Sequence, residues 1–113
     1  MKKIAKYLII EKVESNLYYL RMTPEMQDDI GTIGFLQFKN TDKAELKAND
    51  EFASLEASKA VLTLKMPLDA KVVEWNEAAK TDPKLISSAD DKLNWIMKLS
   101  DIEKDVFEAL EDF

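Results

Sequence analysis

Lys59 is the residue whose setting could support chemistry. It lies in the segment LEASKAVL, residues 55–62, between two short β-like runs, and its neighbours Ser58 and Ala60 have very small side chains. An enzyme that acylates a lysine must bring an activated carboxyl group to the ε-amine, so the amine has to project from a narrow and stiff support. Glycine would add freedom that a presented amine does not need. The segment therefore predicts a presented amine, although a lysine at a turn is ordinarily just solvated.

The residues on either side of Lys59 predict the two arms of a hairpin. Residues 52–57 and 61–65 have strand character, with Leu55, Leu62 and Leu64 as inward-facing candidates and Ser58-Lys59 at the tip. Other short runs between turn signals predict further strands at 7–13, 17–22, 33–38, 70–75 and 94–99. The 33–38 run is apolar on both faces, which predicts cover on two sides. The chain is thus predicted to be mainly β.

Three short helices complete the prediction. In the first, at 23–31, Thr23 can cap, Pro24 suits the first position and Gly31 can end the helix. A second helix begins after Asn76 and ends before Pro83, within residues 76–86.

The third helix is expected at about 100–111 and should pack on the sheets. Ser100 is its predicted cap and Glu103 completes a capping box. Ile102, Val106, Ala109 and Leu110 are predicted to share its buried face. Residues 40–50 are expected to form a polar loop.

Composition excludes several classes of function. The 113 residues suit a single domain spanning 1–113. A net charge of −6, without a basic stripe, makes nucleic acid an improbable partner. Cysteine and histidine are absent, which removes disulfides, thiolate or histidine nucleophiles and nearly every zinc or iron site. The N-terminal apolar run is interrupted at Glu11, too soon for a signal peptide or membrane span, so we expect a cytoplasmic protein.

The order of several short motifs resembles the lipoyl-carrying H protein of the glycine cleavage system. Glu56, Lys59 and Ala60 match that family's modification pattern, and residues 27–33, QDDIGTI, look like its segment before the central strand. The matches that follow downstream, in similar order and spacing, are Pro67, Val72-Val73-Glu74, Asn76-Glu77, Pro83, Leu85 and Trp95. The resemblance covers roughly residues 20 to 99.

The resemblance implies a barrel-sandwich hybrid, two small antiparallel sheets with short helices, and lipoic acid in amide linkage on Lys59. The cofactor would do the chemistry and the chain would present it as a non-catalytic, monomeric carrier. The implied partners are a lipoate-protein ligase and components of glycine cleavage, or dihydrolipoamide dehydrogenase.

Three segments depart from the usual H protein: Lys6-Tyr7-Leu8, Leu68-Asp69-Ala70 and the residues before Trp95. With its opening MKKIAKYL and its segment TPEMQDDIGTIG, the chain is more similar to an H-like subgroup encoded with a lipoate-protein ligase, a macrodomain hydrolase and a sirtuin-type ADP-ribosyltransferase. That similarity implies redox defence or lipoyl relay, with lipoylation-dependent ADP-ribosylation. Asp28 is the matching acceptor, with Asp29 second; the alternative for both is a solvated helix end.

The residues around Lys59 disfavour two other functions, biotin carriage and lysine catalysis. Biotin carriers resemble Met-Lys-Met at the tip, where this chain has Ser58-Lys59-Ala60. A Schiff-base or general-base lysine needs burial or a neighbouring cation, and nothing local supplies either. The remaining alternatives are an authentic glycine cleavage H protein and an unmodified interaction module.

Overall fold

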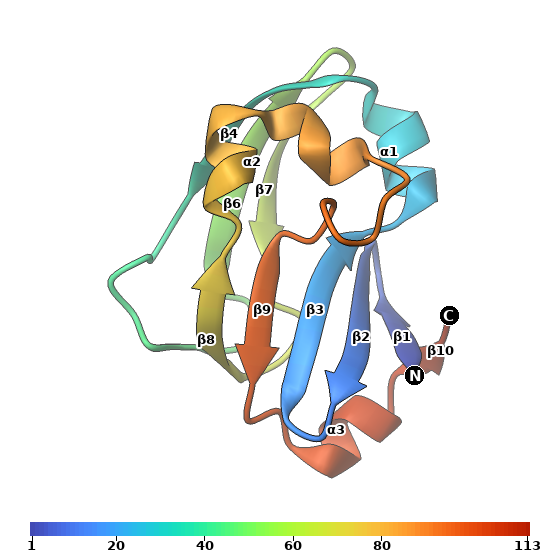
Figure 1. Ribbon diagram of the computed structural model, residues 1–113, viewed down its shortest axis with the longest axis vertical. Helices are drawn as coiled ribbons and strands as arrows, with labels where there is room; N and C mark the ends of the chain where they lie inside the picture. The colour runs from blue at the N-terminus through green and yellow to red at the C-terminus, as the bar shows by residue number, and fades with distance from the viewer.

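Two antiparallel sheets form the protein, whose computed structural model describes residues 1–113 (Figure 1). The larger sheet has the order β10-β1-β2-β3-β9-β8-β5, and the smaller has the order β4-β6-β7. The strands of the larger sheet are β1 (Lys2–Ala5), β2 (Leu8–Glu14), β3 (Leu17–Met22), β5 (Glu45–Leu46), β8 (Ala70–Trp75), β9 (Met97–Ser100) and β10 (Glu111–Asp112). Those of the smaller sheet are β4 (Ile33–Phe38), β6 (Glu51–Ala57) and β7 (Val61–Lys65). The predicted barrel-sandwich hybrid is confirmed.

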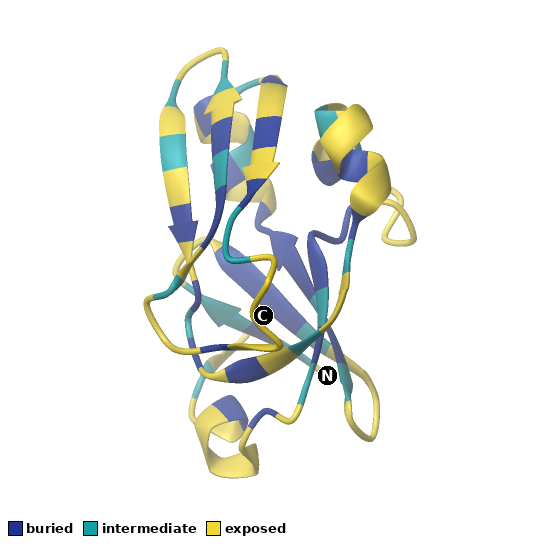
Figure 2. Cartoon of the chain, turned by 90° about the vertical axis from the view of Figure 1, so that its left-hand side faces the viewer, coloured by how far each residue is buried: buried dark blue, intermediate teal, exposed yellow.

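One hydrophobic core lies between the sheets. Ile10, Leu20 and Leu99 of the larger sheet and Leu36 and Leu55 of the smaller sheet belong to the same cluster of buried residues. Each fully buried aliphatic side chain contributes about 1.5–3 kcal/mol relative to an exposed one. Along the strands of the smaller sheet, exposed and buried residues alternate (Figure 2). This alternation shows that the smaller sheet turns one face to the core and one to solvent.

Strand β4 corrects one prediction. We expected cover on both of its faces, but Phe35 and Gln37 are exposed, while Ile33, Leu36 and Phe38 are buried. The register shifts between Ile33 and Phe35, as at a β-bulge. Ile33 and Leu36, three positions apart, therefore both lie on the buried face. An antiparallel sheet can leave its outer face in water, so an apolar residue such as Phe35 need not be covered.

Helix α1 (Pro24–Ile30) has the predicted ends. The Met26 N–H donates to Thr23 Oγ1 at 3.2 Å, Pro24 occupies the start, and Gly31 follows the last helical residue with φ +80°. Ile30 and Met26 are buried, so this helix packs its apolar face on the core.

The predicted helix within 76–86 is divided. Helix α2 (Glu77–Thr81) ends before Pro83, as expected, but a separate 3₁₀ helix η1 (Pro83–Ser87) follows. Asn76 does not cap α2 with its side chain. Its buried amide instead donates to the carbonyls of Leu93 and Trp95, at 3.1 and 2.7 Å, because the loop before β9 passes beside it.

The C-terminal region differs from the predicted helix at 100–111. Helix α3 (Lys104–Glu108) is shorter, because Asp101 has a positive φ of 56° and interrupts any helix that would begin at Ser100. Glu103 precedes α3 without making a side-chain cap. Phe107, not the exposed Val106, is the buried residue of α3.

The chain ends lie side by side, where β10 pairs with β1 (Figure 1). Lys3 Nζ donates to Asp112 Oδ1 at 2.7 Å across this pair. The sequence predicted neither β1, β5 nor β10, since strands of two to four residues carry almost no periodic signal. No helix of the protein is both long enough and apolar enough to cross a membrane.

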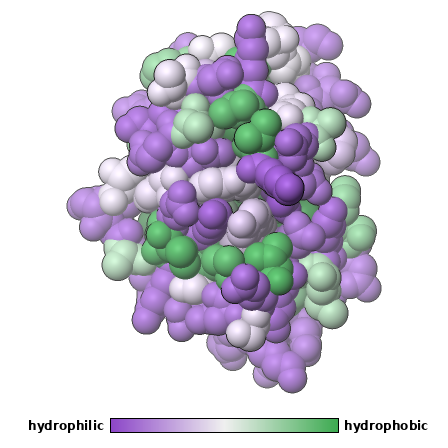
Figure 3. All heavy atoms as spheres, in the orientation of Figure 1, coloured by the Kyte–Doolittle hydropathy of each residue, from purple (hydrophilic) through white to green (hydrophobic).

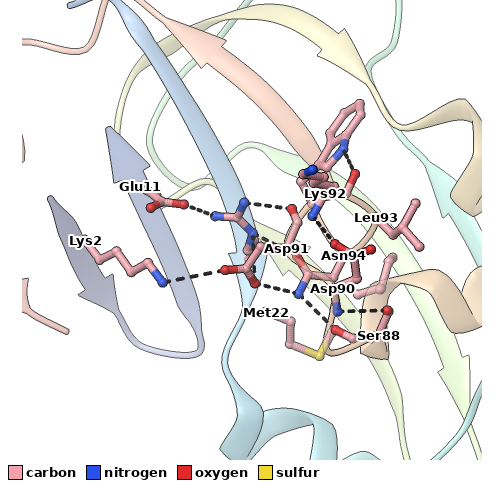
Figure 4. A network of polar contacts seen from close by, with 12 residues as sticks. Lys2, Glu11, Met22, Ser88, Asp90, Asp91, Lys92, Leu93 and Asn94 are labelled. Atoms are coloured by element: carbon pink, nitrogen blue, oxygen red, sulfur yellow. Dashed lines mark hydrogen bonds and ion pairs between the residues drawn. The ribbon is translucent and has the colours of Figure 1, made fainter. Parts of the chain in front are cut away.

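The loop before β9 is attached to the larger sheet through Arg21. This buried guanidinium donates to Glu11 Oε1, to Asn94 Oδ1 at 2.8 Å and to the Asp91 carbonyl at 2.9 Å. Figure 4 shows Glu11 on β2 facing Asp91 and Asn94, which both lie in the loop before β9. Because a buried charge needs such partners, Arg21 ties the loop to β2 and β3.

Candidate functional site

Lys59 lies at the tip of the β6–β7 hairpin. The Ala57 N–H donates to the Ala60 carbonyl at 2.8 Å, so Ser58 and Lys59 form a two-residue connection. Neither residue has a positive φ, which removes the need for the Asn-Gly pair that common two-residue hairpin turns require. The side chain of Lys59 is exposed and enters no ion pair. An acylating enzyme could therefore reach its amine.

The tip is braced by the segment that follows α1. The Ser58 N–H donates to the Thr32 carbonyl at 2.9 Å, and the Lys59 N–H donates to the Ile30 carbonyl at 2.8 Å. In return, Ser58 Oγ accepts from the Thr32 N–H at 3.1 Å. The backbone of the tip is thus held from one side while the lysine side chain remains free.

Gly31 makes this close approach possible. A Cβ at this position would lie 2.1 Å from Ser58 Oγ, and the backbone φ of +80° also disfavours other residues. The sequence predicted Gly31 only as the end of a helix. Its contact with Ser58 links residues that are far apart in the chain, and no local pattern indicated it.

The residues predicted to flank Lys59 have different surroundings. Ser58 belongs to the brace, whereas Ala60 is half-buried and packs against the core. Glu56 is exposed, lies opposite Val61 on β7 and forms no ion pair. The amine and this carboxylate are therefore both available to a partner.

Asp28 and Asp29 are exposed on α1. Asp28 lines a shallow depression of about 460 Å³ together with Gly31, Thr32 and Lys84. Since Gly31 and Thr32 also contact the hairpin tip, the structure brings Asp28 to the same end of the molecule as Lys59. Asp29 is not among the lining residues.

A mostly apolar groove of about 440 Å³ lies between β7 and the β1–β2 turn. Leu62, Leu64 and Tyr7 are among its lining residues. Lys6 and Lys65 also line it, but no carboxylate does. Elsewhere, no three histidine, cysteine, aspartate or glutamate residues are arranged to hold a metal ion.

Comparisons with known proteins point to a single family. Residues 2–112 match the family model described as glycine cleavage H-protein. The chain is 45% identical to a glycine cleavage system H-like protein of Staphylococcus aureus, over 99% of both chains. It is 32% identical to a glycine cleavage system H protein of Staphylococcus epidermidis, over 78% of this chain and 69% of that one.

A solved structure has the same fold. The crystal structure of a glycine cleavage system H protein from Mycobacterium marinum superposes with a TM-score of 0.72, covering 88% of this chain and 81% of that chain at 20% identity. Proteins of this family are lipoyl carriers without catalytic activity of their own. The full-length family match and the presented amine lead to one conclusion: this chain belongs to the glycine cleavage H-protein family and is an H-protein-like lipoyl carrier.

Proposed function

We propose that Lys59 is the lipoyl attachment site. The observation that carries this assignment is an exposed amine, free of ion pairs, on a two-residue tip whose backbone is braced by Ile30 and Thr32. In the attachment step the Lys59 nitrogen attacks the activated carboxyl carbon of lipoate, the activating group leaves, and the amine loses a proton. The amide formed has no charge, and an exposed site accommodates it without burying an unpaired group.

The attached group supplies a dithiolane whose sulfurs exchange electrons or carry a group, and the protein supplies its presentation. A stiff tip with a mobile lysine stem lets the arm enter successive partner sites. Each visit is then intramolecular within a complex, so effective concentration replaces diffusion of a free cofactor. We propose one carrier domain for residues 1–113, since both sheets contribute to the same core.

Intact mass tests the attachment. Co-expression with a lipoate-protein ligase should add one lipoyl group to the wild-type protein, and Lys59→Arg should abolish the addition. Lys65→Arg is the matched control, because Lys65 is also exposed and lies at the far end of β7. An unmodified wild-type protein after incubation with an active ligase would refute the proposal and favour an interaction module.

We further propose that the arm serves redox defence or lipoyl relay rather than transfer of an aminomethyl group. The groove beside β7 supports this choice, because Lys6 and Lys65 line it without any carboxylate. A lipoyl arm loaded with an aminomethyl group carries a positively charged amine. In this groove that amine would be repelled by the ammonium groups of Lys6 and Lys65. Reconstitution with glycine decarboxylase and aminomethyltransferase tests the alternative: sustained turnover by the lipoylated protein would make it an authentic glycine cleavage carrier.

Modification of Asp28 by a sirtuin-type ADP-ribosyltransferase, reversed by a macrodomain hydrolase, is the second part of this proposal. The Asp28 carboxylate would attack the ribose carbon of NAD that bears nicotinamide, which leaves. Exposure of Asp28 and the shared Gly31–Thr32 segment support recognition of both sites by one enzyme. The lipoylated Asp28→Asn and Asp29→Asn variants are incubated with the transferase and NAD. Mass spectrometry then shows which of the two substitutions prevents ADP-ribosylation. Unchanged ADP-ribosylation of Asp28→Asn would eliminate Asp28 as the acceptor.

A further inference from the structure

Three exposed side chains form a row on the outer face of the smaller sheet. Phe35 of β4 lies opposite Glu56 of β6, and Glu56 lies opposite Val61 of β7. Phe35 is 49% exposed and Val61 is 75% exposed. We call Phe35, Glu56 and Val61 the outward row. It places two large apolar side chains on either side of one carboxylate.

The outward row lies next to the hairpin tip. Glu56 precedes Lys59 by three residues and Val61 follows it by two. On the opposite face of this sheet Leu55 is buried and Ala57 and Leu62 pack against the core, although Leu62 also lines the groove along β7. The Ile30–Thr32 segment covers another side of the tip through backbone hydrogen bonds. An enzyme approaching the Lys59 amine therefore has the outer face of the sheet available as a contact surface.

Apolar residues are exposed elsewhere too, as at the groove along β7, where Tyr7 is 52% exposed. On the face seen in Figure 3, hydrophobic residues form small groups among hydrophilic ones. Single exposed apolar residues are normal, so the significance of Phe35 and Val61 lies in their shared register beside the modification hairpin.

Charge indicates the kind of partner. Glu56 has no cationic partner within the protein, and the whole chain has a net charge of −6. A second copy docked symmetrically on the outward row would bring two Glu56 carboxylates close together, and like charges at an interface are unfavourable. A partner with an apolar contact surface and a basic side chain complements the row.

We propose that the outward row is the docking surface for the enzyme that acylates Lys59, with Phe35 and Val61 as apolar anchors and Glu56 paired to a basic residue of that enzyme. This inference rests on the proposed function of Lys59. The row would let the enzyme recognise this carrier, which neither the Lys59 amine nor the hydrogen bonds that hold the tip can do.

Steady-state lipoylation by a purified lipoate-protein ligase tests the row. Phe35→Thr combined with Val61→Thr keeps β-forming residues at exposed strand positions, so the fold should be retained. We expect kcat/KM for the carrier to fall about tenfold or more, mainly through KM, as for loss of apolar anchors at an interface. Glu56→Gln should lower it less and reduce its dependence on salt.

Val73→Thr is the matched control, because Val73 is 53% exposed on β8, in the other sheet, and should leave kcat/KM unchanged. Equal rates for the double variant and the wild type would overturn the docking surface while leaving Lys59 as the attachment site. An equal loss in Val73→Thr would also overturn it. A wild type that is never modified would refute the attachment proposal itself.

Two further measurements address misfolding of the double variant and self-association of the wild type. Val61→Thr alone changes a side chain that is three-quarters exposed, so it remains informative if the double variant does not fold. Sedimentation of the wild type should show a monomer. A dimer that the double variant dissociates would show that a second copy occupies the row, and would overturn the proposal.

Discussion

The hairpin tip and the Arg21 cluster hold a cationic residue in opposite ways. Arg21 is buried, and its side chain is held by Glu11, Asn94 and the Asp91 carbonyl. Lys59 is exposed, and only its backbone is held, through the Ile30 carbonyl. In the first region the charged group is a structural connector. In the second, the same kind of charge is left free for an enzyme because the fold anchors the main chain instead.

This difference predicts which substitutions should destabilise each region. Stability should depend on the Arg21 side chain, which has partners in separate segments, but not on the Lys59 side chain. At the tip, stability and presentation should depend on the small residues that permit the brace, Gly31 and Ser58.

Removing the two cations separately is the strongest test of the comparison. Arg21→Met should lower the free energy of unfolding by about 3 kcal/mol, because it leaves Glu11 and Asn94 without their partner in a largely buried site. Lys59→Met should change it by less than about 0.5 kcal/mol, as for an ordinary exposed substitution. Urea unfolding measures both. Similar losses in the two variants would contradict the distinction.

Filling the space at Gly31 should have the next largest effect. Gly31→Ala places a methyl group against Ser58 Oγ and strains the positive φ, at a cost of about 2 kcal/mol. Combining it with Ser58→Ala should recover part of this loss, because the nearest atom is removed while the backbone strain remains. A double-mutant cycle by thermal unfolding measures the coupling. Strictly additive effects would show that the two residues do not act together.

Loosening the brace without adding bulk should have a smaller effect. Ser58→Ala removes the acceptor for the Thr32 N–H and should cost about 1 kcal/mol. Hydrogen exchange at the Thr32 amide should become faster, while exchange at Leu20, in the core of the larger sheet, should not change. Unchanged protection of Thr32 would mean that the serine hydroxyl does not hold the tip.

The smallest effect concerns acid stability near Arg21. The hydrogen bond from Asn94 lowers the pKa of Asp91; partial burial opposes this, and the charges of Arg21 and Lys2 add to the lowering. A lowered pKa in the folded state stabilises the protein above the unfolded pKa of about 3.9, and that contribution is lost as the pH falls through the folded value. Because the carboxylate is more than half exposed, it amounts to less than about 1 kcal/mol.

Asp91→Asn should therefore be slightly less stable than the wild type at pH 7, and the gap should close below about pH 4. Unfolding in urea across this range measures the gap. A gap that is independent of pH would exclude a role for the Asp91 charge. Lys59→Met serves as the control from the other region and should run parallel to the wild type at every pH.

Local patterns in the sequence were enough to predict the central elements. The alternation in β6 and β7, the small residues beside Lys59, and the Thr23-Pro24 and Gly31 signals of α1 all act over a few residues. Their physical basis is the geometry of strands and helix ends, which neighbouring residues determine. The hairpin, the first helix and the tip position of Lys59 therefore follow from the order of the amino acids.

Only the tertiary structure decided the features that depend on distant partners. The approach of Ser58 to Gly31, the use of the Asn76 amide by the loop before β9, and the interruption of the C-terminal helix at Asp101 are not encoded by periodicity. A buried polar group takes whichever partner the fold brings within hydrogen-bonding distance, and a close contact requires a glycine wherever two segments happen to meet. The sequence by itself determined the presented lysine and its strands, and the packing of remote segments determined how firmly that lysine is held and which faces of its hairpin remain open.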